Sequence, residues 1–367
     1  MATFDPRIPR LLAIQLGEEA VEISEAGRYV GPEGEKDIAL QVRSSVTRTR
    51  YFGPDHAHDV PSTGPHETKF EVTNETTLSA HRRHQAKGHD VVSLNFASAT
   101  HPGGGFLRGA RAQEEYLCRS SALYLTFKDC PMYAYHRERG DCLYSDAMIY
   151  SPDVPVFRAD DHSLLPSPYP ASFITSAAPL ATHVSIYELK NLPKVIYQRA
   201  LKVLAVAKAH GHDSLILGAW GCGAFGNNGN LVADLFHKAL TQDFAGAFKE
   251  VTFAVVDTSP EGRFIRPFAR RFSPEALGVA KAEKLLCKED VIERTDIILR
   301  KHLDMPEGPY AHLRFESDLK SQFIMHDAMI FDLEFEFRMP TMNEPDASRM
   351  RTVSELYDYV LSHGREP

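Results

Sequence analysis

Apolar residues recur along this chain in two spacings, one typical of amphipathic helices and one typical of buried strands. Residues 7–29 place Leu11, Leu12, Ile14 and Ala20 among polar positions, which predicts an amphipathic helix. Short apolar and β-branched runs bounded by glycine or polar residues indicate strands. The predicted strands are KDIALQV (36–42), KFEVT (69–73), DVVSLNFA (90–97), AMIYSPDVPVF (147–157), ASFITSAAP (171–179), DSLILGAW (213–220) and EVTFAVVD (250–257).

Segments with helical spacing separate these strands. They cover 76–88, 113–126, 194–210, a stretch that begins near Leu231, and 274–286. Strands that alternate with helices predict an α/β fold with a layered sheet. In such folds, ligands bind in loops at the carboxyl ends of the strands. We therefore expect the functional residues to lie just after the predicted strands.

The last part of the chain differs from this pattern. We place a boundary between a catalytic domain at 1–286, which includes an N-terminal helical extension, and a C-terminal extension at 287–367. Within the extension, 292–305 and 351–363 have helical spacing and 322–339 resembles a strand. It is too hydrophobic for a disordered tail. We expect a small α+β element that packs on the core or binds a partner.

Composition narrows the class of protein. Of the 367 residues, 43% are hydrophobic and 25% charged, as in ordinary globular proteins. The net charge of −8 argues against direct binding of duplex nucleic acid, and no run of about eighteen apolar residues indicates a membrane span. The cysteines are odd in number and lack C-x-x-C spacing, which favours reduced thiols. We expect an intracellular monomer in the cytoplasm or nucleus.

A glycine-rich loop follows the strand at 90–97 and precedes two acidic residues. The glycines are Gly103, Gly104 and Gly105. Because glycine has no side chain, backbone N–H groups in such a loop can approach an anion closely. Glu114 and Glu115 follow Gln113 and supply a proton donor and acceptor beside that ligand. This arrangement suggests hydrolysis of a compound that carries a diphosphate.

Two nucleotide-binding patterns do not fit this segment. A dinucleotide-binding G-x-G-x-x-G pattern starting at Gly103 requires glycine at position 108, where Arg108 stands, and no Gly-Lys-Ser/Thr follows for a P-loop. A simple tight turn remains an alternative for the glycines. An alternative for the two glutamates is a favourable interaction with the helix dipole alone. Since adjacent helical residues diverge by roughly 100°, the carboxylates are expected to play unequal roles.

A second glycine-rich loop, residues 218–227, precedes a predicted helix. Backbone N–H groups of such a loop and the N-terminus of the helix can bind an anion. Its central residues are Gly221, Cys222, Gly223, Ala224, Phe225 and Gly226. We interpret Cys222 as a small residue between glycines, because no partner histidine for a nucleophile is evident. His56, His58, His81 and His84 have spacings conceivable for metal ligands but no further ligands beside them, so neither a metal nor a cofactor is predicted.

The order Gly-Gly-Gly, short gap, Gln-Glu-Glu resembles the signature of poly(ADP-ribose) glycohydrolases of the microbial type. The similarity runs through LNFASATHPGGGFLRGARAQEEYLCRSSALY (94–124), YSDAMIYSPDVPVFR (144–158) and LILGAWGCGAFGNNGNLVADLF (215–236). It extends over most of the chain before the C-terminal extension. The resemblance implies a macrodomain-like fold, three α/β/α layers around a mixed central sheet.

The resemblance also implies roles for individual residues. Glu115 matches the general acid/base of an oxocarbenium-like reaction, and Glu114 would hold ribose hydroxyls, with Gln113 orienting the loop. Asn95 would contact the distal ribose, and the second glycine loop would wrap the diphosphate, with Phe225 against the nucleotide. The candidate adenine pocket comprises Thr73–Thr77 and Arg263–Arg266, in which Phe264 would stack on the base.

The implied substrate is poly(ADP-ribose), attached to ADP-ribosylated proteins, with ADP-ribose as product. Two alternatives stay open. In the first, the chain removes single ADP-ribose units from protein or nucleic-acid acceptors. In the second, it binds ADP-ribose without turnover. The intact Gln113-Glu114-Glu115 sequence favours cleavage of the polymer.

Overall fold

The computed structural model describes residues 8–56, 63–260, 262–273, 292, 295–299 and 353–363. The chain divides into two compact units, one of Met1–His183 with Pro193–Ser273 and one of Val184–Leu192 with Pro274–Pro367. The first unit holds the sheet and the candidate site. The boundary at 286/287 stays a prediction.

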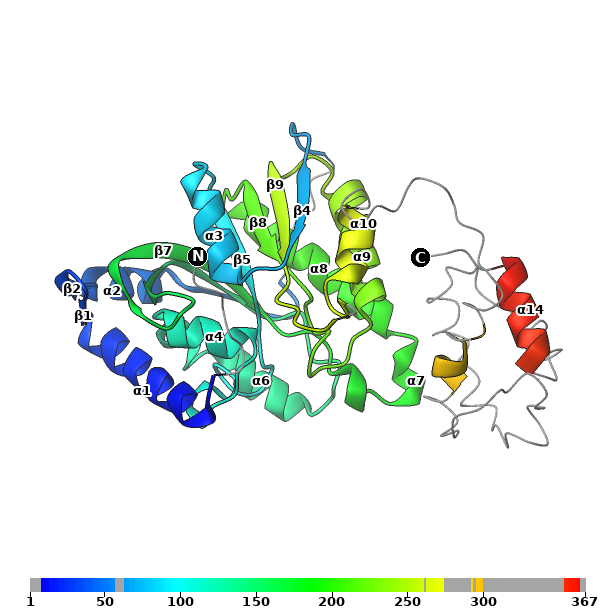
Figure 1. Ribbon diagram of the computed structural model, residues 1–367, viewed down its shortest axis with the longest axis horizontal. Coiled ribbons are helices and arrows are strands. Elements are labelled where there is room, and N and C mark those ends of the chain that lie inside the picture. Colours follow the sequence, from blue (N-terminus) through cyan, green and yellow to red (C-terminus); the bar gives the residue numbers. More distant parts are fainter. Residues whose placement is uncertain are drawn as a thin grey trace. The chain divides into compact units, whose positions relative to one another are not determined.

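The first unit is built around a seven-stranded sheet (Figure 1). Its spatial order is β3 (Arg50–Phe52), β6 (Met148–Arg158), β7 (Leu164–Ser176), β5 (Val91–Phe96), β8 (Ser214–Leu217), β9 (Glu250–Ala254) and β4 (Lys69–Thr73). Strands β7, β5, β8, β9 and β4 run parallel to one another, whereas β6 is antiparallel to both β3 and β7. The sheet is therefore mixed, as the resemblance implies.

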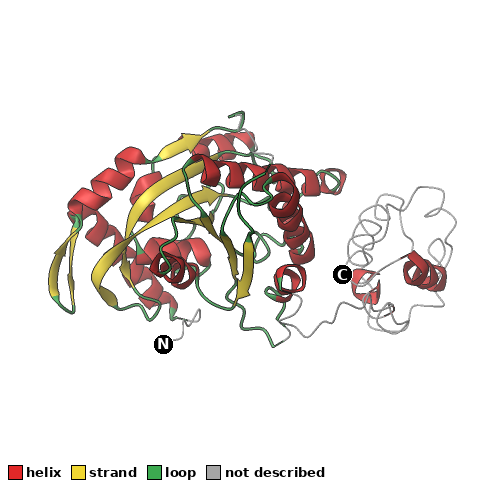
Figure 2. Ribbon diagram, turned by 90° about the horizontal axis from the view of Figure 1, so that it is seen from above, coloured by secondary structure: helices red, strands yellow, loops and turns green. Residues whose placement is uncertain are grey.

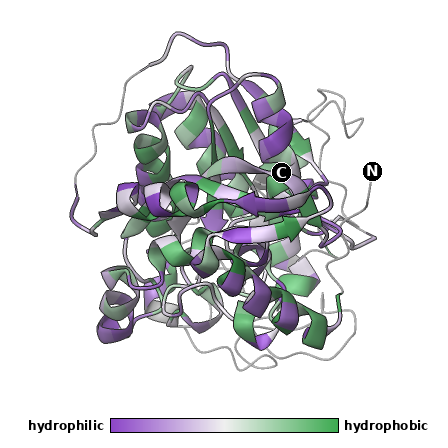
Figure 3. Ribbon diagram, turned by 90° about the vertical axis from the view of Figure 1, so that its left-hand side faces the viewer, coloured by the Kyte–Doolittle hydropathy of each residue, from purple (hydrophilic) through white to green (hydrophobic). Residues whose placement is uncertain are grey.

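Helices cover both faces of this sheet (Figure 2). They are α1 (Arg10–Ala26), α2 (Ala39–Arg48), α3 (Thr77–Ala86), α4 (Gln113–Ser120), α5 (Leu123–Phe127), α6 (Pro131–Arg139), α8 (Leu192–Ala209), α9 (Gly229–Lys238) and α10 (Arg266–Phe272), with short turns η1 (Phe106–Arg108), η2 (Ala181–His183) and η3 (Ala239–Asp243). Every residue of β8 and β9 is buried, so both faces of these strands are covered. Figure 3 shows hydrophilic and hydrophobic residues side by side along the helices, as expected of helices that pack one face on the sheet.

The strand predicted at 36–42 is wrong. The chain forms a hairpin of β1 (Arg28–Gly31) and β2 (Gly34–Asp37), and α2 follows at once. The Asp37 side chain accepts a hydrogen bond from the backbone N–H of Ala39 at 2.9 Å, which favours the start of a helix. Ile38 and Val42 are buried while Leu40 is 74% exposed, so the apolar residues follow helical spacing.

The single helix predicted at 113–126 is two helices, α4 and α5. Between them Ser121 is extended and forms a bridge with Val156 of β6. The Ser121 hydroxyl donates to the Leu117 carbonyl at 2.8 Å and accepts from the Leu123 N–H at 3.3 Å, which satisfies backbone groups at the break. The break sets the length of α4 and leaves its start unchanged.

The second unit contains α7 (Ile186–Leu189) and α14 (Val353–His363). The helix predicted at 351–363 is confirmed, and the one at 292–305 agrees at residues 292 and 295–299. The helix predicted at 274–286 and the strand at 322–339 lie outside the described residues. Within the described ranges, no helix combines the length and apolar content needed to cross a membrane.

Candidate active site

A cavity of about 560 Å³ opens at the carboxyl ends of the parallel strands. Its walls come from the residues after β5, β8 and β9 and from the first turns of α3 and α4. The main contributions are Phe96–Ser98, Ala219–Gly221, Ala254–Ser259, Glu75–Thr77 and Ala112–Tyr116. This size and position suit a small-molecule ligand.

Glu114 and Glu115 lie in the first turn of α4, against the cavity. Both are buried, with exposed fractions of 2% and 8%. Glu114 Oε2 accepts a hydrogen bond from the backbone N–H of Ser98 at 2.7 Å, and Glu115 Oε1 accepts one from the N–H of Gly105 at 2.9 Å. Among the described residues, Glu115 Oε2 has no hydrogen-bond partner. One oxygen of Glu115 is thus held by the protein, while the other is buried and has no partner among the described residues.

The glycine triplet packs directly on these carboxylates. Gly104 has φ +61°, a left-handed conformation that favours glycine. A Cβ at Gly104 would lie 2.3 Å from Glu115 Oε1 and 3.1 Å from Glu114 Oε2. Gly103 and Gly105 do not line the cavity, so this loop contacts the two carboxylates more closely than the ligand space. A direct contact between the triplet and phosphate stays a prediction.

The environment of Glu114 favours its neutral form. Burial raises the pKa of this carboxyl well above its usual range, and the negative charge of Glu115 adds to the rise. The N–H of Ser98 opposes it by stabilising the anion. On balance, burial keeps the Glu114 carboxyl protonated over a wider pH range than an exposed glutamate.

Gln113 orients the start of α4. Its Oε1 accepts from the N–H of Phe96 at 2.9 Å, and its Nε2 donates to the Leu94 carbonyl at 2.8 Å and to Thr77 Oγ1 at 3.0 Å. These bonds fasten α4 to β5 and to the first residue of α3. Although Gln113 lines the cavity, its side-chain amide is engaged by the protein.

Asn95 lies behind the carboxylates, on β5. It is fully buried, and its Nδ2 donates to Thr175 Oγ1 at 3.1 Å and faces Glu114 Oε1 at 3.5 Å. Its Oδ1 has no partner among the described residues. Asn95 does not line the cavity, so its predicted ribose contact remains untested.

The second glycine loop forms another part of the wall. Gly221, Gly223, Ala224 and Phe225 line the cavity, whereas Cys222 and Gly226 do not. Gly221 has φ +73°, and a Cβ there would lie 2.5 Å from the Ala178 side chain.

Cys222 itself is buried next to this loop. Burial raises the pKa of its thiol to about 12, so the thiol stays protonated and is a poor nucleophile. This agrees with the interpretation of Cys222 as a small packing residue. Trp220 is also buried, and its Nε1 donates to the Ser176 carbonyl at 3.0 Å.

Phe264 is placed on the cavity by a residue that sequence reasoning missed. Asp257 follows β9, and its Oδ2 accepts from the N–H groups of Phe264 at 2.6 Å and Ile265 at 3.0 Å. Its Oδ1 accepts from the N–H and hydroxyl of Ser259. These bonds outweigh the effect of burial and lower the pKa of Asp257. The Asp-x-Ser spacing after an apolar strand was the available signal.

Asp160 is a second residue that the sequence did not single out. It accepts hydrogen bonds from Thr76 Oγ1 at 2.9 Å, from Ser79 Oγ at 2.7 Å and from the Tyr116 hydroxyl. It thereby ties the start of α3 to α4, which carries the glutamates. Nothing local marks Asp160, because its partners are distant in the sequence.

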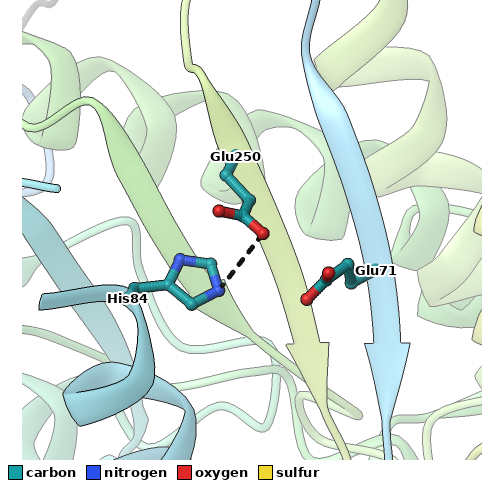
Figure 4. A group of neighbouring side chains, drawn as sticks. All are labelled: Glu71, His84 and Glu250. Atoms are coloured by element: carbon teal, nitrogen blue, oxygen red, sulfur yellow. Dashed lines mark ion pairs between the residues drawn. The ribbon is translucent and has the colours of Figure 1, made fainter. Parts of the chain in front are cut away.

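One group of side chains has the composition of a metal site (Figure 4). Glu71 on β4, His84 on α3 and Glu250 at the start of β9 lie near one another, and none of the three lines the cavity. Cations already pair with both carboxylates, since Arg83 donates to Glu71 at 2.9 Å and Lys87 to Glu250 at 2.7 Å.

The histidine of this group is also engaged. Both ring nitrogens of His84 lie within hydrogen-bond distance of hydroxyls, Ser214 Oγ at 2.6 Å and Thr252 Oγ1 at 2.8 Å. Burial lowers the pKa of His84 to about 4. We interpret the group as a structural ion-pair cluster.

Comparisons with known proteins agree with this geometry. The family model described as "Microbial-type PARG, catalytic domain" matches residues 17–159. The crystal structure of poly(ADP-ribose) glycohydrolase from Thermomonospora curvata is 46% identical, with a TM-score of 0.68, covering 71% of this chain and 100% of that one. Its complex with the inhibitor ADP-HPD gives 45% identity and a TM-score of 0.66 over the same shares.

A further similar structure is the poly(ADP-ribose) glycohydrolase from Deinococcus radiodurans in complex with ADP-ribose. It is 41% identical with a TM-score of 0.61, covering 63% of this chain and 97% of that one. No curated protein matched the chain. The macrodomain-like α/β fold with a mixed sheet is thereby confirmed, and the chain belongs to the microbial-type poly(ADP-ribose) glycohydrolases, a family of hydrolases.

Proposed function

We propose that this chain hydrolyses the ribose–ribose O-glycosidic bond of poly(ADP-ribose), with Glu115 as general acid and base, and releases ADP-ribose. The observation that carries the proposal is the state of the Glu115 carboxylate. The N–H of Gly105 occupies Oε1, whereas Oε2 is buried at the cavity without a partner among the described residues. A carboxyl held by one oxygen and free at the other suits proton transfer to a bound substrate.

The cavity offers a place for each part of a terminal ADP-ribose unit. The adenine would lie at Phe264, the diphosphate along Gly221–Phe225, and the distal ribose at the two glutamates. A related enzyme was solved in complex with ADP-ribose, which supports this class of ligand. Backbone N–H groups of the second glycine loop are suitable donors for phosphate oxygens.

The reaction would proceed through an oxocarbenium-like transition state, as in glycoside hydrolysis generally. Glu115 gives its proton to the 2′-oxygen of the neighbouring ribose as the C1″–O2′ bond breaks. The Glu115 carboxylate then takes a proton from water, whose oxygen bonds to C1″. The products are ADP-ribose and a polymer shortened by one unit with a free 2′-hydroxyl. The substrate diphosphate would stabilise the developing positive charge.

Glu114 would serve this reaction by binding. Because burial raises its pKa, a neutral Glu114 would act as a hydrogen-bond donor to ribose oxygens while Ser98 N–H holds its other oxygen. No metal takes part in this scheme.

The proposal is tested by comparing substrates. Native protein would be incubated with automodified poly(ADP-ribose) and, separately, with a mono-ADP-ribosylated protein, and free ADP-ribose measured by mass. We expect release from the polymer to be much faster. Faster release from the mono-modified protein would favour the mono-ADP-ribosyl hydrolase alternative, and ADP-ribose binding without release from either would favour a reader.

A further inference from the structure

A buried arginine lies one helical turn beyond Glu115. Arg119 is 2% exposed and stands four residues after Glu115 on α4, so the two side chains share a face of the helix. Within the described part of the chain, Arg119 forms no ion pair, and its Nε has no hydrogen-bond partner. A buried cation without an adjacent carboxylate is costly. Its position therefore calls for an explanation beyond packing.

Arg119 is connected to Glu115 through the backbone of the glycine loop. Its Nη1 donates to the Ala110 carbonyl at 2.6 Å, and the N–H of Ala110 donates to the Gly105 carbonyl at 3.0 Å. The N–H of Gly105 donates in turn to Glu115 Oε1 at 2.9 Å. Three hydrogen bonds thus close a ring that begins and ends on α4.

Arg119 and Glu115 also interact through their charges. The carboxylate of Glu115 is the strongest opposite charge acting on Arg119, and it counters the lowering of the Arg119 pKa by burial. A buried guanidinium on the same helix face suits the second half of the proposed reaction, in which the Glu115 carboxylate acts as a base.

Arg158, a second buried arginine beside α4, differs from Arg119 in having a carboxylate partner. Arg158 donates from Nε to the Arg119 carbonyl at 2.9 Å, and its Nη2 lies 2.7 Å from Glu19 Oε2 on α1. Arg158 thus has a carboxylate partner and fastens α4 to α1. Arg119 has none and directs its guanidinium to the loop that holds Glu115.

We propose that Arg119 is a positioning residue for the glycohydrolase reaction, which holds Gly105 N–H on Glu115 Oε1 and leaves Oε2 directed at the substrate. The inference rests on the proposed role of Glu115. It predicts that loss of Arg119 lowers kcat without weakening the binding of ADP-ribose, since Arg119 does not line the cavity. Small displacements of a catalytic group cost roughly a hundredfold in rate.

The test compares Arg119→Met, Arg119→Lys and Glu115→Gln in the full chain, with kcat and KM for poly(ADP-ribose), Kd for ADP-ribose and melting temperature. Lys202→Met is the matched control, because buried Lys202 donates to the carbonyls of Gly53 at 2.5 Å and Pro54 at 3.3 Å, outside the cavity. We expect Arg119→Met to lose roughly ten- to a hundredfold in kcat with KM and Kd nearly unchanged. Arg119→Lys should recover part of the loss, and Lys202→Met should lose stability but retain kcat.

The inference is overturned if Arg119→Met keeps native kcat, or if kcat and ADP-ribose affinity fall together. Equal loss in Arg119→Lys and Arg119→Met would also overturn it. Should Arg119→Met fail to fold, Arg119→Lys decides alone: a reduced kcat at native Kd supports the inference and a native kcat contradicts it. Glu115→Gln separates the two proposals, because native-like turnover in that variant removes the role of Glu115 and this inference with it.

Discussion

Glu114 and Glu115 are neighbours in the sequence but differ in what holds them. Ser98 N–H binds Glu114, and Gly105 N–H binds one oxygen of Glu115. The sequence placed both glutamates at the start of a helix and predicts unequal roles for them, since adjacent helical positions diverge. It did not identify Asp160, whose partners Thr76 and Tyr116 are 84 and 44 residues away. Contacts of that kind depend on the completed fold, so no local pattern announces them.

The pH dependence of stability should reveal the neutral Glu114. The pKa of Glu114 is raised in the folded state, so the native protein retains this proton above pH 4.5, where the unfolded chain loses it. The contribution of Glu114 to stability therefore falls as the pH rises from about 4.5 towards the folded pKa. Glu114→Gln should therefore melt higher than native protein at pH 8, with a smaller difference at pH 4. The effect is about 1.4 kcal/mol for each tenfold change in proton affinity.

Exposed Glu18 on α1 supplies the control for this measurement. Glu18→Gln should shift the melting temperature little and equally at both pH values. A Glu114→Gln variant that melts lower than native protein at pH 8 would contradict the assignment of a neutral Glu114.

Substituting Gly104 should lower kcat although both carboxylates remain in the chain. In Gly104→Ala the added Cβ would meet Glu115 Oε1, and the positive φ would strain the backbone by ~1–3 kcal/mol. We expect at least a tenfold loss in kcat, measured with poly(ADP-ribose). Gly53→Ala is the matched control, since a Cβ at Gly53 meets nothing within 4 Å. Native kcat in Gly104→Ala would show that the triplet does not position Glu115.

At the scale of elements, strands were predicted better than the short helices. Strands β5, β8 and β9 combine apolar runs with clear boundaries, because both of their faces are buried. The segment 36–42 was misassigned since its apolar residues fit either period over so short a stretch. Helix α10 was not predicted, and its position depends on the turn that Asp257 organises.

The turn between β9 and α10 should control ligand affinity. Asp257→Ala removes charge-assisted bonds to the Phe264 and Ile265 amides, each worth about 1.5–3 kcal/mol. Released Phe264 should lower the affinity for ADP-ribose by roughly tenfold or more, measured by calorimetry. Asp161→Ala is the control, because Asp161 accepts similar bonds from Ser163 in an exposed turn. Unchanged affinity in Asp257→Ala would remove Phe264 from the binding site.

At the scale of the whole molecule, the cavity belongs to one of the two units. All its lining residues lie within Met1–His183 and Pro193–Ser273. The sequence placed the boundary at 286/287 from the change in hydrophobic pattern. We expect a chain that ends at residue 286 to turn over poly(ADP-ribose) with kcat within about threefold of the full chain, on the expectation that the core folds independently. A folded but inactive truncation would assign the C-terminal extension to catalysis.

The most direct test of the account compares native protein with Glu115→Gln on automodified poly(ADP-ribose), with ADP-ribose affinity measured in parallel. We predict that native protein releases ADP-ribose, while Glu115→Gln binds it with native affinity and loses turnover by at least a hundredfold, as expected for removal of a general acid. Turnover by Glu115→Gln close to the native rate would contradict the assignment of Glu115 as the acid and base.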